Sequence, residues 1–334
     1  MRYAMMLVVM AGLSQGVVMA QQTGAPEGTT AEATKVSYPT GRVFAENFKV
    51  VGEGYAFTEG PAFVADATVQ PLGGYFLFCD VSPSTVLRWN GDEQAPEVYF
   101  EGTQGALGMA VKADGTLVQC RKDSRSVVEV KIEDGKVTST TTRASDFEGK
   151  RLNATNDCVV ARDGSIWFTD PPFFTPKGEL ELDFTGIFRV SAEGVIEAKA
   201  RGVQYANGLA FSPDEKTLYV NDFRGRKVLA YSVDEKGALS AEPKVVADLA
   251  AMAKEVGAQG RGGADGLRVR SDGTILATGP GGVYGLSATG ELLDFLATGS
   301  ATNVAIGGAD GNVALVTAGG RVVSVRLTPV ATNK

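Results

Sequence analysis

The chain has 334 residues, a formal net charge of −7 and no histidine. Without histidine, the chain cannot form Ser-His-Asp triads, Cys-His dyads or any metal site built on imidazole. The acidic balance, with no basic run, argues against nucleic acid as a partner.

The first 20 residues have the pattern of a signal peptide. Arg2 supplies the positive end, residues 4–13 are largely apolar, and Val18-Met19-Ala20 offers small residues at the cleavage positions. A membrane anchor is the alternative, but it needs about 20 apolar residues, and polar residues interrupt this stretch at 14–16. Residues 21–38 are polar and predict a disordered lead-in. The sequence therefore predicts an exported protein, periplasmic or secreted, with no membrane association after cleavage.

From residue 39 to residue 330 the chain repeats one pattern. A short apolar strand, a tight turn and a strand rich in β-branched and aromatic residues follow one another six times. The turns recur every 38 to 58 residues, which brackets the ~40–50-residue period of propeller blades. The fold class is therefore predicted as all-β, a six-bladed β-propeller. The turns are Gly73-Gly74, Asp114-Gly115, Asp163-Gly164, Pro213-Asp214, Asp272-Gly273 and Asp310-Gly311.

Three further expectations concern the same region. Residues 42–51 should pair with residues 321–327 to close the ring, so we predict residues 39–330 to be one domain. The one convincing helical pattern covers residues 246–256 and reads as a loop excursion. Cys79 and Cys120 occupy matching places in successive repeats, too far apart for a disulfide. With Cys158, they are expected to be buried thiols.

One position in each repeat predicts a metal site. In five repeats it precedes the turn aspartate by seven residues. As the start of an innermost strand, it should face the central channel. Five of the six residues carry a side-chain oxygen, a ligand set that suits one divalent ion at the channel mouth. Ca²⁺ is the first candidate, with Mg²⁺, Mn²⁺ and Zn²⁺ as alternatives. The competing interpretation is that Asn and Asp cap local backbone groups there. The six are Glu59, Leu107, Asn156, Asn207, Asp265 and Asn303.

The segments around these positions, from about Phe57 to Leu327, resemble the gluconolactonase family, which includes regucalcin (SMP-30). The resemblance implies that Glu59, Asn207 and Asp265 are metal ligands and that Asp265 is the catalytic acid or base. It also implies that Asn156 contacts substrate, with Asp157 beside it. The matching segments are Glu59–Phe63, Lys150–Asn153, Asn156–Asp157, Asp163–Pro172, Asn207–Asp214, Asp265–Leu267 and Thr302–Gly308.

Three departures from the family pattern border the predicted mouth. Leu107-Gly108-Met109 stands where many members have Asn-Gly-Leu, and Arg121-Lys122 stands where they tend to have Glu-His. Phe173-Phe174 replaces an aromatic-glycine segment. Because of these changes, the resemblance does not identify the substrate.

The resemblance implies a metal-dependent lactonase that opens a sugar-type lactone. We expect the protein to be a monomer or weak dimer. The metal would polarise the carbonyl, and either Asp265 or a metal-bound water would be the working group. Arg151, Arg224 and Phe173 are candidate contacts for a sugar-like acid, or else ordinary surface residues. The alternatives are another hydrolase or esterase, or a condensing enzyme, on the same propeller, and a non-catalytic sugar- or metal-binding protein of the envelope.

Overall fold

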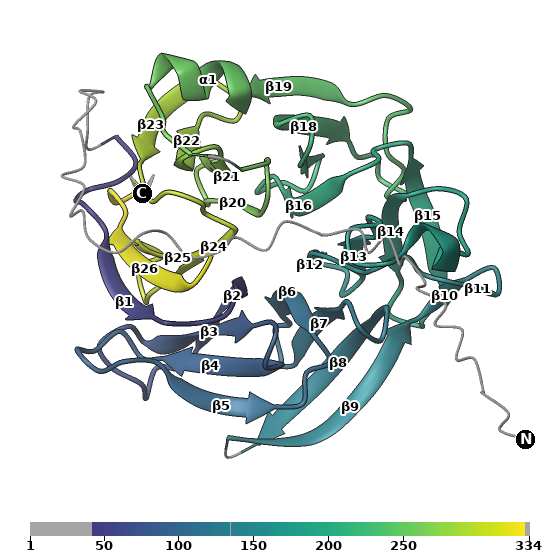
Figure 1. Ribbon diagram of the computed structural model, residues 1–334, viewed down its shortest axis with the longest axis horizontal. Coiled ribbons are helices and arrows are strands. Elements are labelled where there is room, and N and C mark those ends of the chain that lie inside the picture. Colours follow the sequence, from purple (N-terminus) through teal and green to yellow (C-terminus); the bar gives the residue numbers. More distant parts are fainter. Residues whose placement is uncertain (1–41, 134, 261, 331–334) are drawn as a thin grey trace, which may run out of the picture. The chain divides into compact units, whose positions relative to one another are not determined.

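The computed structural model describes residues 42–330, apart from residues 134 and 261 (Figure 1). The predicted signal peptide, residues 1–20, and the predicted lead-in, residues 21–38, lie outside the described residues. Six four-stranded antiparallel sheets follow one another around a common centre. The predicted all-β, six-bladed propeller is therefore confirmed.

Within each of the first five blades, the strands are hydrogen-bonded in chain order. The first blade comprises β2 (Thr58–Ala65), β3 (Gly74–Asp80), β4 (Thr85–Trp89) and β5 (Glu97–Glu101). The second comprises β6 (Ala106–Val111), β7 (Leu117–Arg121), β8 (Ser126–Glu133) and β9 (Lys136–Ala144). The third comprises β12 (Cys158–Val160), β13 (Ile166–Thr169), β14 (Gly186–Val190) and β15 (Ile196–Arg201).

The fourth blade comprises β16 (Ala206–Phe211), β17 (Thr217–Asp222), β18 (Lys227–Ser232) and β19 (Lys244–Asp248). The fifth comprises β20 (Leu267–Val269), β21 (Ile275–Gly279), β22 (Gly282–Leu286) and β23 (Leu292–Leu296). A two-stranded hairpin of β10 (Asp146–Phe147) and β11 (Lys150–Arg151) stands between the second and third blades. A short 3₁₀ turn covers Lys177–Glu179.

The sixth blade is built from both ends of the described chain. Its inner strands are β24 (Asn303–Gly307), β25 (Val313–Ala318) and β26 (Arg321–Arg326), and its outermost strand is β1 (Lys49–Glu53). A further bridge joins Phe44 to Leu327. The buried carboxylate of Asp294 accepts the backbone N–H groups of Val43 and Phe44, each at 3.1 Å. The expected closure between residues 42–51 and 321–327 is therefore confirmed.

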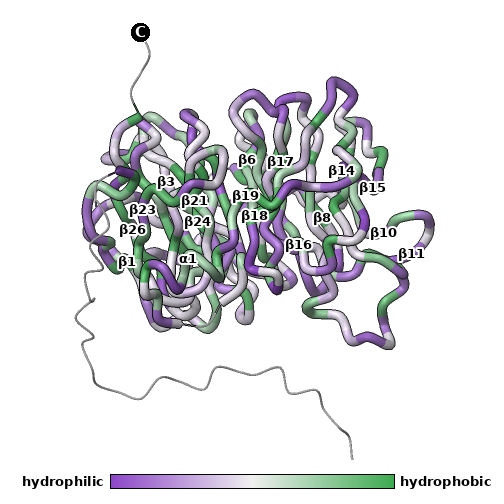
Figure 2. Tube along the Cα trace, turned by 90° about the horizontal axis from the view of Figure 1, so that it is seen from above, coloured by the Kyte–Doolittle hydropathy of each residue, from purple (hydrophilic) through white to green (hydrophobic). Residues whose placement is uncertain are grey.

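The hydrophobic core lies between neighbouring blades. Side chains of β7, β12, β13 and β14 form one buried cluster, in which the Phe168 and Phe188 rings stack with centroids 5.3 Å apart. The inner strands are covered on both faces, so β7 is buried along its whole length. Figure 2 shows hydrophilic residues concentrated in the loops at the blade ends. Those loops are therefore where polar groups meet solvent.

Two smaller expectations can be compared with the structure. The helix α1 covers Leu249–Glu255, because residues 244–248 continue the fourth blade as β19. Asp248 caps the helix, and its Oδ1 accepts the Ala251 N–H at 2.9 Å. Cys79, Cys120 and Cys158 are free and buried, as predicted. In the part of the chain that the structure describes, no helix has the length and apolar character to cross a bilayer.

Candidate active site

Irregularities in the inner strands position the predicted channel residues. The pairing of β2 with β3 shifts register between Glu59 and Ala62, and that of β16 with β17 shifts between Ala206 and Leu209. Such bulges insert an extra residue and re-aim the side chains beside it. Glu59 lies at the shift in β2 and Asn207 at the shift in β16, two strands that stand near the centre of the ring (Figure 1).

Small residues bring neighbouring inner strands close together. Gly60 has a φ of +52°, and a Cβ on it would lie 1.8 Å from the Leu107 carbonyl oxygen. A side chain is therefore excluded there on two grounds. The N–H of Gly108 donates to the Asn156 carbonyl at 2.7 Å, and that of Gly208 donates to the Asp265 carbonyl at 3.0 Å. These blade-to-blade hydrogen bonds fix the backbone that carries the channel residues.

Three carboxylates from different blades influence one another near the channel. Glu59 is 6% exposed and Asp157 is fully buried, whereas Asp265 keeps part of its surface open to solvent. Burial raises the pKa of Glu59 to about 7. The hydrogen bond from the Gly60 N–H lowers this pKa, and the negative charge of Asp157 raises it. The pKa of Asp265 is raised by burial first, then by the charges of Glu59 and Asp157. Each carboxylate therefore disfavours the ionised form of the others.

Arg268 and Asn303 contact the buried carboxylates of this acidic group. The Arg268 guanidinium Nη1 lies 3.4 Å from Asp157 Oδ2 and donates to the Leu267 carbonyl at 2.7 Å, while Nη2 donates to the Met109 carbonyl at 3.3 Å. Asn303 Nδ2 donates to both Glu59 Oε2 and Asp157 Oδ2, each at 3.2 Å. Burial raises the pKa of Asp157, and the positive charge of Arg268 opposes that rise most strongly.

The Asn207 side chain supplies an amide beside Asp265. It is 3% exposed, and its interaction with the Asp265 carboxylate opposes the rise in the pKa of that group. Its Oδ1 is buried and has no hydrogen-bond partner, a state that costs free energy. Asn221 Nδ2 donates to the Asp265 carbonyl at 2.8 Å and so fixes the backbone of that residue.

The structure does not show the predicted central metal site. Within residues 42–330, apart from 134 and 261, no three His, Cys, Asp or Glu side chains group closely enough to hold a metal ion. Two carboxylates and one unpartnered amide oxygen remain as the donor set: Glu59, Asp265 and Asn207. Such all-oxygen donors fit a hard divalent cation.

The other predicted site residues fall in different places. Asn156 is 9% exposed, its carbonyl accepts the Gly108 N–H, and it directly precedes the buried Asp157. Asp157 is buried behind the mouth and engaged by Arg268 and Asn303. Phe173 is half-buried in the loop after β13. Arg151 is exposed in β11, at the periphery of the blades, and the structure does not bring it to the channel residues (Figure 1).

Three residues near the site, Arg268, Tyr205 and Phe223, were not among the predicted positions, and a fourth, Asn303, was predicted only as a channel position. Arg268 carries a sequence signal, since it is a charged residue inside an otherwise apolar three-residue strand, directly after Asp265-Gly266-Leu267. Asn303 belongs to the predicted channel positions but fitted the capping interpretation equally well. Tyr205 and Phe223 lie in loops, where nothing in the sequence pattern marks them.

These features define a class: a six-bladed β-propeller with buried carboxylates and amides where its inner strands meet. The chain belongs to the SMP-30/Gluconolactonase/LRE-like region family, whose model matches residues 57–320. The resemblance seen in the sequence segments is thereby confirmed.

Known relatives agree with this assignment. The chain is 29% identical to a gluconolactonase from Zymomonas mobilis over 269 residues, which cover 75% of this chain and 72% of the relative. A solved structure of a gluconolactonase from Xanthomonas campestris superposes with a TM-score of 0.72 at 28% identity, covering 86% of this chain and 91% of that one. Regucalcin from Agrobacterium tumefaciens, described as a calcium-binding protein, has a TM-score of 0.65 at 18% identity over 86% and 96% of the two chains. The last likeness shows the fold.

Proposed function

We propose that the protein is a metal-dependent lactonase that hydrolyses a sugar-type lactone at the mouth of the channel. The gluconolactonase relatives support a lactone-hydrolysing function. The observation that carries the metal dependence is the unpartnered Asn207 amide oxygen beside the mutually repelling carboxylates of Glu59 and Asp265. A cation would satisfy all three groups at once.

The charge balance supports a divalent ion. The carboxylates of Glu59, Asp157 and Asp265 carry three negative charges when ionised, and Arg268 compensates one of them. The two remaining charges match one divalent cation, held by Glu59, Asn207 and Asp265. Ca²⁺ is our first candidate, because every donor is oxygen. When bound, the ion would supply Lewis-acid polarisation of the lactone carbonyl.

The side chains of the site would have separate roles in proton transfer, substrate binding and positioning. Asp265 is partly open to solvent and accepts a proton from the water that attacks the carbonyl carbon. The ring C–O bond then breaks, and the same proton passes to the departing alkoxide, which leaves an open-chain hydroxy acid. Asn156, at the edge of the site, orients the substrate by hydrogen bonds. Arg268 positions Asp157 and Asn303 positions Glu59 through their hydrogen bonds.

One observation favours a second candidate, a non-catalytic sugar- or metal-binding protein. In the second blade the channel position is Leu107, which is apolar and 2% exposed, where a polar side chain would be expected in an enzyme of this family. Such a protein would keep the metal site and lose turnover. Metal-dependent stability without lactone hydrolysis would identify it.

The test is hydrolysis of glucono-δ-lactone in a pH-stat, after chelation and after separate return of Ca²⁺, Mg²⁺, Mn²⁺ or Zn²⁺. We expect a rate above the spontaneous background that chelation abolishes and one ion restores. Asp265→Asn should abolish the rate, whereas Asp272→Asn, an exposed turn residue of the same blade, should leave it unchanged. Full activity in Asp265→Asn would refute the assigned role, and no acceleration with any ion would refute the function.

A further inference from the structure

Four aromatic side chains form a contiguous surface beside the candidate active site. We call Phe173, Phe174, Tyr205 and Phe223 the aromatic arc. The Phe173 ring lies 6.3 Å from Phe174, 5.5 Å from Tyr205 and 5.1 Å from Phe223, measured between centroids. Phe174 is 38% exposed, and the other three are half-buried. Adjacent aromatic rings open to solvent are a feature of ligand-binding surfaces.

The aromatic arc is joined directly to the strands that carry the proposed ligands. A Cβ on Gly263 would lie 2.5 Å from Phe223 Cγ, so this ring packs on the backbone two residues before Asp265. The Phe223 carbonyl also accepts the Ala264 N–H at 3.2 Å. Tyr205 precedes Asn207 by two residues in the sequence. The arc is therefore one wall of the same mouth.

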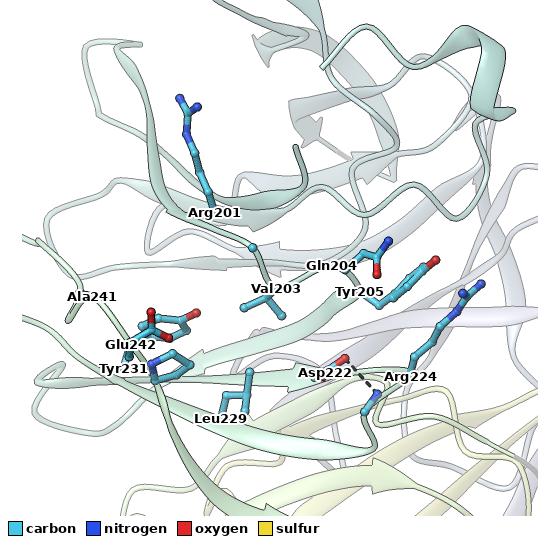
Figure 3. Close-up of a pocket in the computed structure, with 13 residues that line it drawn as sticks. Arg201, Val203, Gln204, Tyr205, Asp222, Arg224, Leu229, Tyr231, Ala241 and Glu242 are labelled. Carbon is cyan, nitrogen blue, oxygen red and sulfur yellow. Dashed lines mark hydrogen bonds between the residues drawn. The ribbon is translucent and has the colours of Figure 1, made fainter. Parts of the chain in front are cut away.

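A cavity of about 770 Å³ runs along the fourth blade, and Tyr205 is the member of the aromatic arc that lines it (Figure 3). In Figure 3 the side chains of Gln204 and Tyr205 lie side by side, with Asp222 and Arg224 nearby. Asp222 pairs across β16 and β17 with Ala206, the neighbour of Asn207, which places this end of the cavity next to the site. Cavities of roughly 300–1,000 Å³ accommodate small molecules.

The lining of the cavity favours a hydroxyl-rich ligand over a hydrocarbon chain. Gln204, Asp222, Arg224 and Glu242 all contribute polar side chains to it. The Arg224 guanidinium carbon lies 3.8 Å from the centroid of the Tyr205 ring and covers one face of it, which leaves the rest of the ring and the guanidinium N–H groups to the cavity. A sugar ring has an apolar C–H face for an aromatic platform and hydroxyl groups for the surrounding donors and acceptors.

We infer that Tyr205 and this cavity form a second sugar subsite, so that the preferred substrate is the lactone of an oxidised disaccharide. The inference rests on the proposed function. The lactone ring would occupy the mouth beside Asn207 and Asp265, and the second ring would lie against Tyr205. The cavity also reaches β18, two strand spacings or about 10 Å from β16, which leaves room beyond a single ring.

The test compares kcat/KM for glucono-δ-lactone and for cellobiono-δ-lactone, a disaccharide lactone, in the full-length protein. We expect the wild type to prefer the disaccharide lactone by about tenfold, the effect of a few additional contacts. Tyr205→Ala and Arg224→Ala should each remove most of this preference, and Tyr205→Phe should keep it by retaining the ring. Arg326→Ala, an exposed arginine at the far end of β26, is the matched control and should change neither value.

Binding of the open-chain acid, cellobionate, separates failure of the subsite from failure of the enzyme. We expect calorimetry to detect binding that Tyr205→Ala weakens by about tenfold. Hydrolysis of neither lactone, with binding that depends on Tyr205, would reject the lactonase function and keep the subsite. An unchanged preference in Tyr205→Ala and Arg224→Ala, no cellobionate binding, or a preference for lactones with long alkyl chains would overturn the subsite.

Discussion

The ion pair between Arg268 and Asp157 leads to a quantitative prediction for Arg268→Met. The substitution keeps much of the side-chain volume and removes the guanidinium that lies 3.4 Å from the buried carboxylate. Removing one partner of a buried pair costs about 3–5 kcal/mol. The Arg268 side chain is 18% exposed, and Asp157 can take up a proton when its partner is lost. Both effects reduce the penalty, so we expect about 2 kcal/mol at neutral pH.

The penalty should depend on pH in a defined direction. The pKa of Asp157 is already raised in the folded protein, and removal of Arg268 raises it further because that charge is the largest opposing effect. A raised folded pKa gives stability that is complete below the unfolded value of about 3.9 and is lost as pH rises. The variant should therefore be closest to wild type at pH 5 and furthest from it at pH 8.

Thermal unfolding followed by circular dichroism at the two pH values measures this difference. For a domain of this size, about 2 kcal/mol corresponds to a shift in Tm of about 3 °C. A double-mutant cycle with Asp157→Asn should show that the two losses are far from additive, and Arg326→Met should behave like wild type. An equal Tm shift at both pH values, together with additive losses, would refute the assigned ion pair.

Three further predictions follow from the site, the closure and the N-terminus. Ca²⁺ at 100 times its Kd should raise the stability of the wild type by about 2.7 kcal/mol. In a thermal shift assay, Asn207→Leu should abolish that rise and Asn207→Asp should retain it. An undiminished rise in the leucine variant would exclude Asn207 as a ligand. Asp294→Ala should cost about 3 kcal/mol in chemical denaturation, because two buried N–H groups lose their charged acceptor, and a loss below about 0.5 kcal/mol would contradict the importance of this anchor. Mass spectrometry of protein recovered from the periplasm or medium should find Gln21 at the N-terminus, and recovery of the intact chain would refute the signal peptide.

Local chemistry explains why the sequence predicts the blades so well. Asp-Gly turns such as Asp163-Gly164 require particular backbone conformations, so the turn residues mark where each pair of strands reverses. Helix boundaries are harder to predict, because Val245, Val246 and Ala247 are apolar residues that occur in either element. Pairing with β18 in the fourth blade makes Lys244–Asp248 the strand β19.

The site is less predictable, because its support comes from residues far apart in the chain. Arg268 contacts Asp157 across 111 positions and Met109 across 159. A charged residue in a short strand signals a buried partner but does not identify it. Arg151 illustrates the same point, since the sequence marks it as a candidate contact for a sugar-like acid but does not reveal its exposed position in β11, at the periphery of the blades. Sequence spacing predicts the channel positions, and only the folded ring reveals their neighbours.

The composition of the sixth blade has a consequence for synthesis. Val43 reaches its carboxylate partner 251 positions later, and β1 waits for β26 near the end of the chain. A ribosome would therefore release almost the entire polypeptide before the first strand could find its place. Contacts of such long sequence separation slow folding. For a chain that we propose to be exported, this delay would keep the polypeptide unfolded until it has crossed the membrane. The ring would then close only after export.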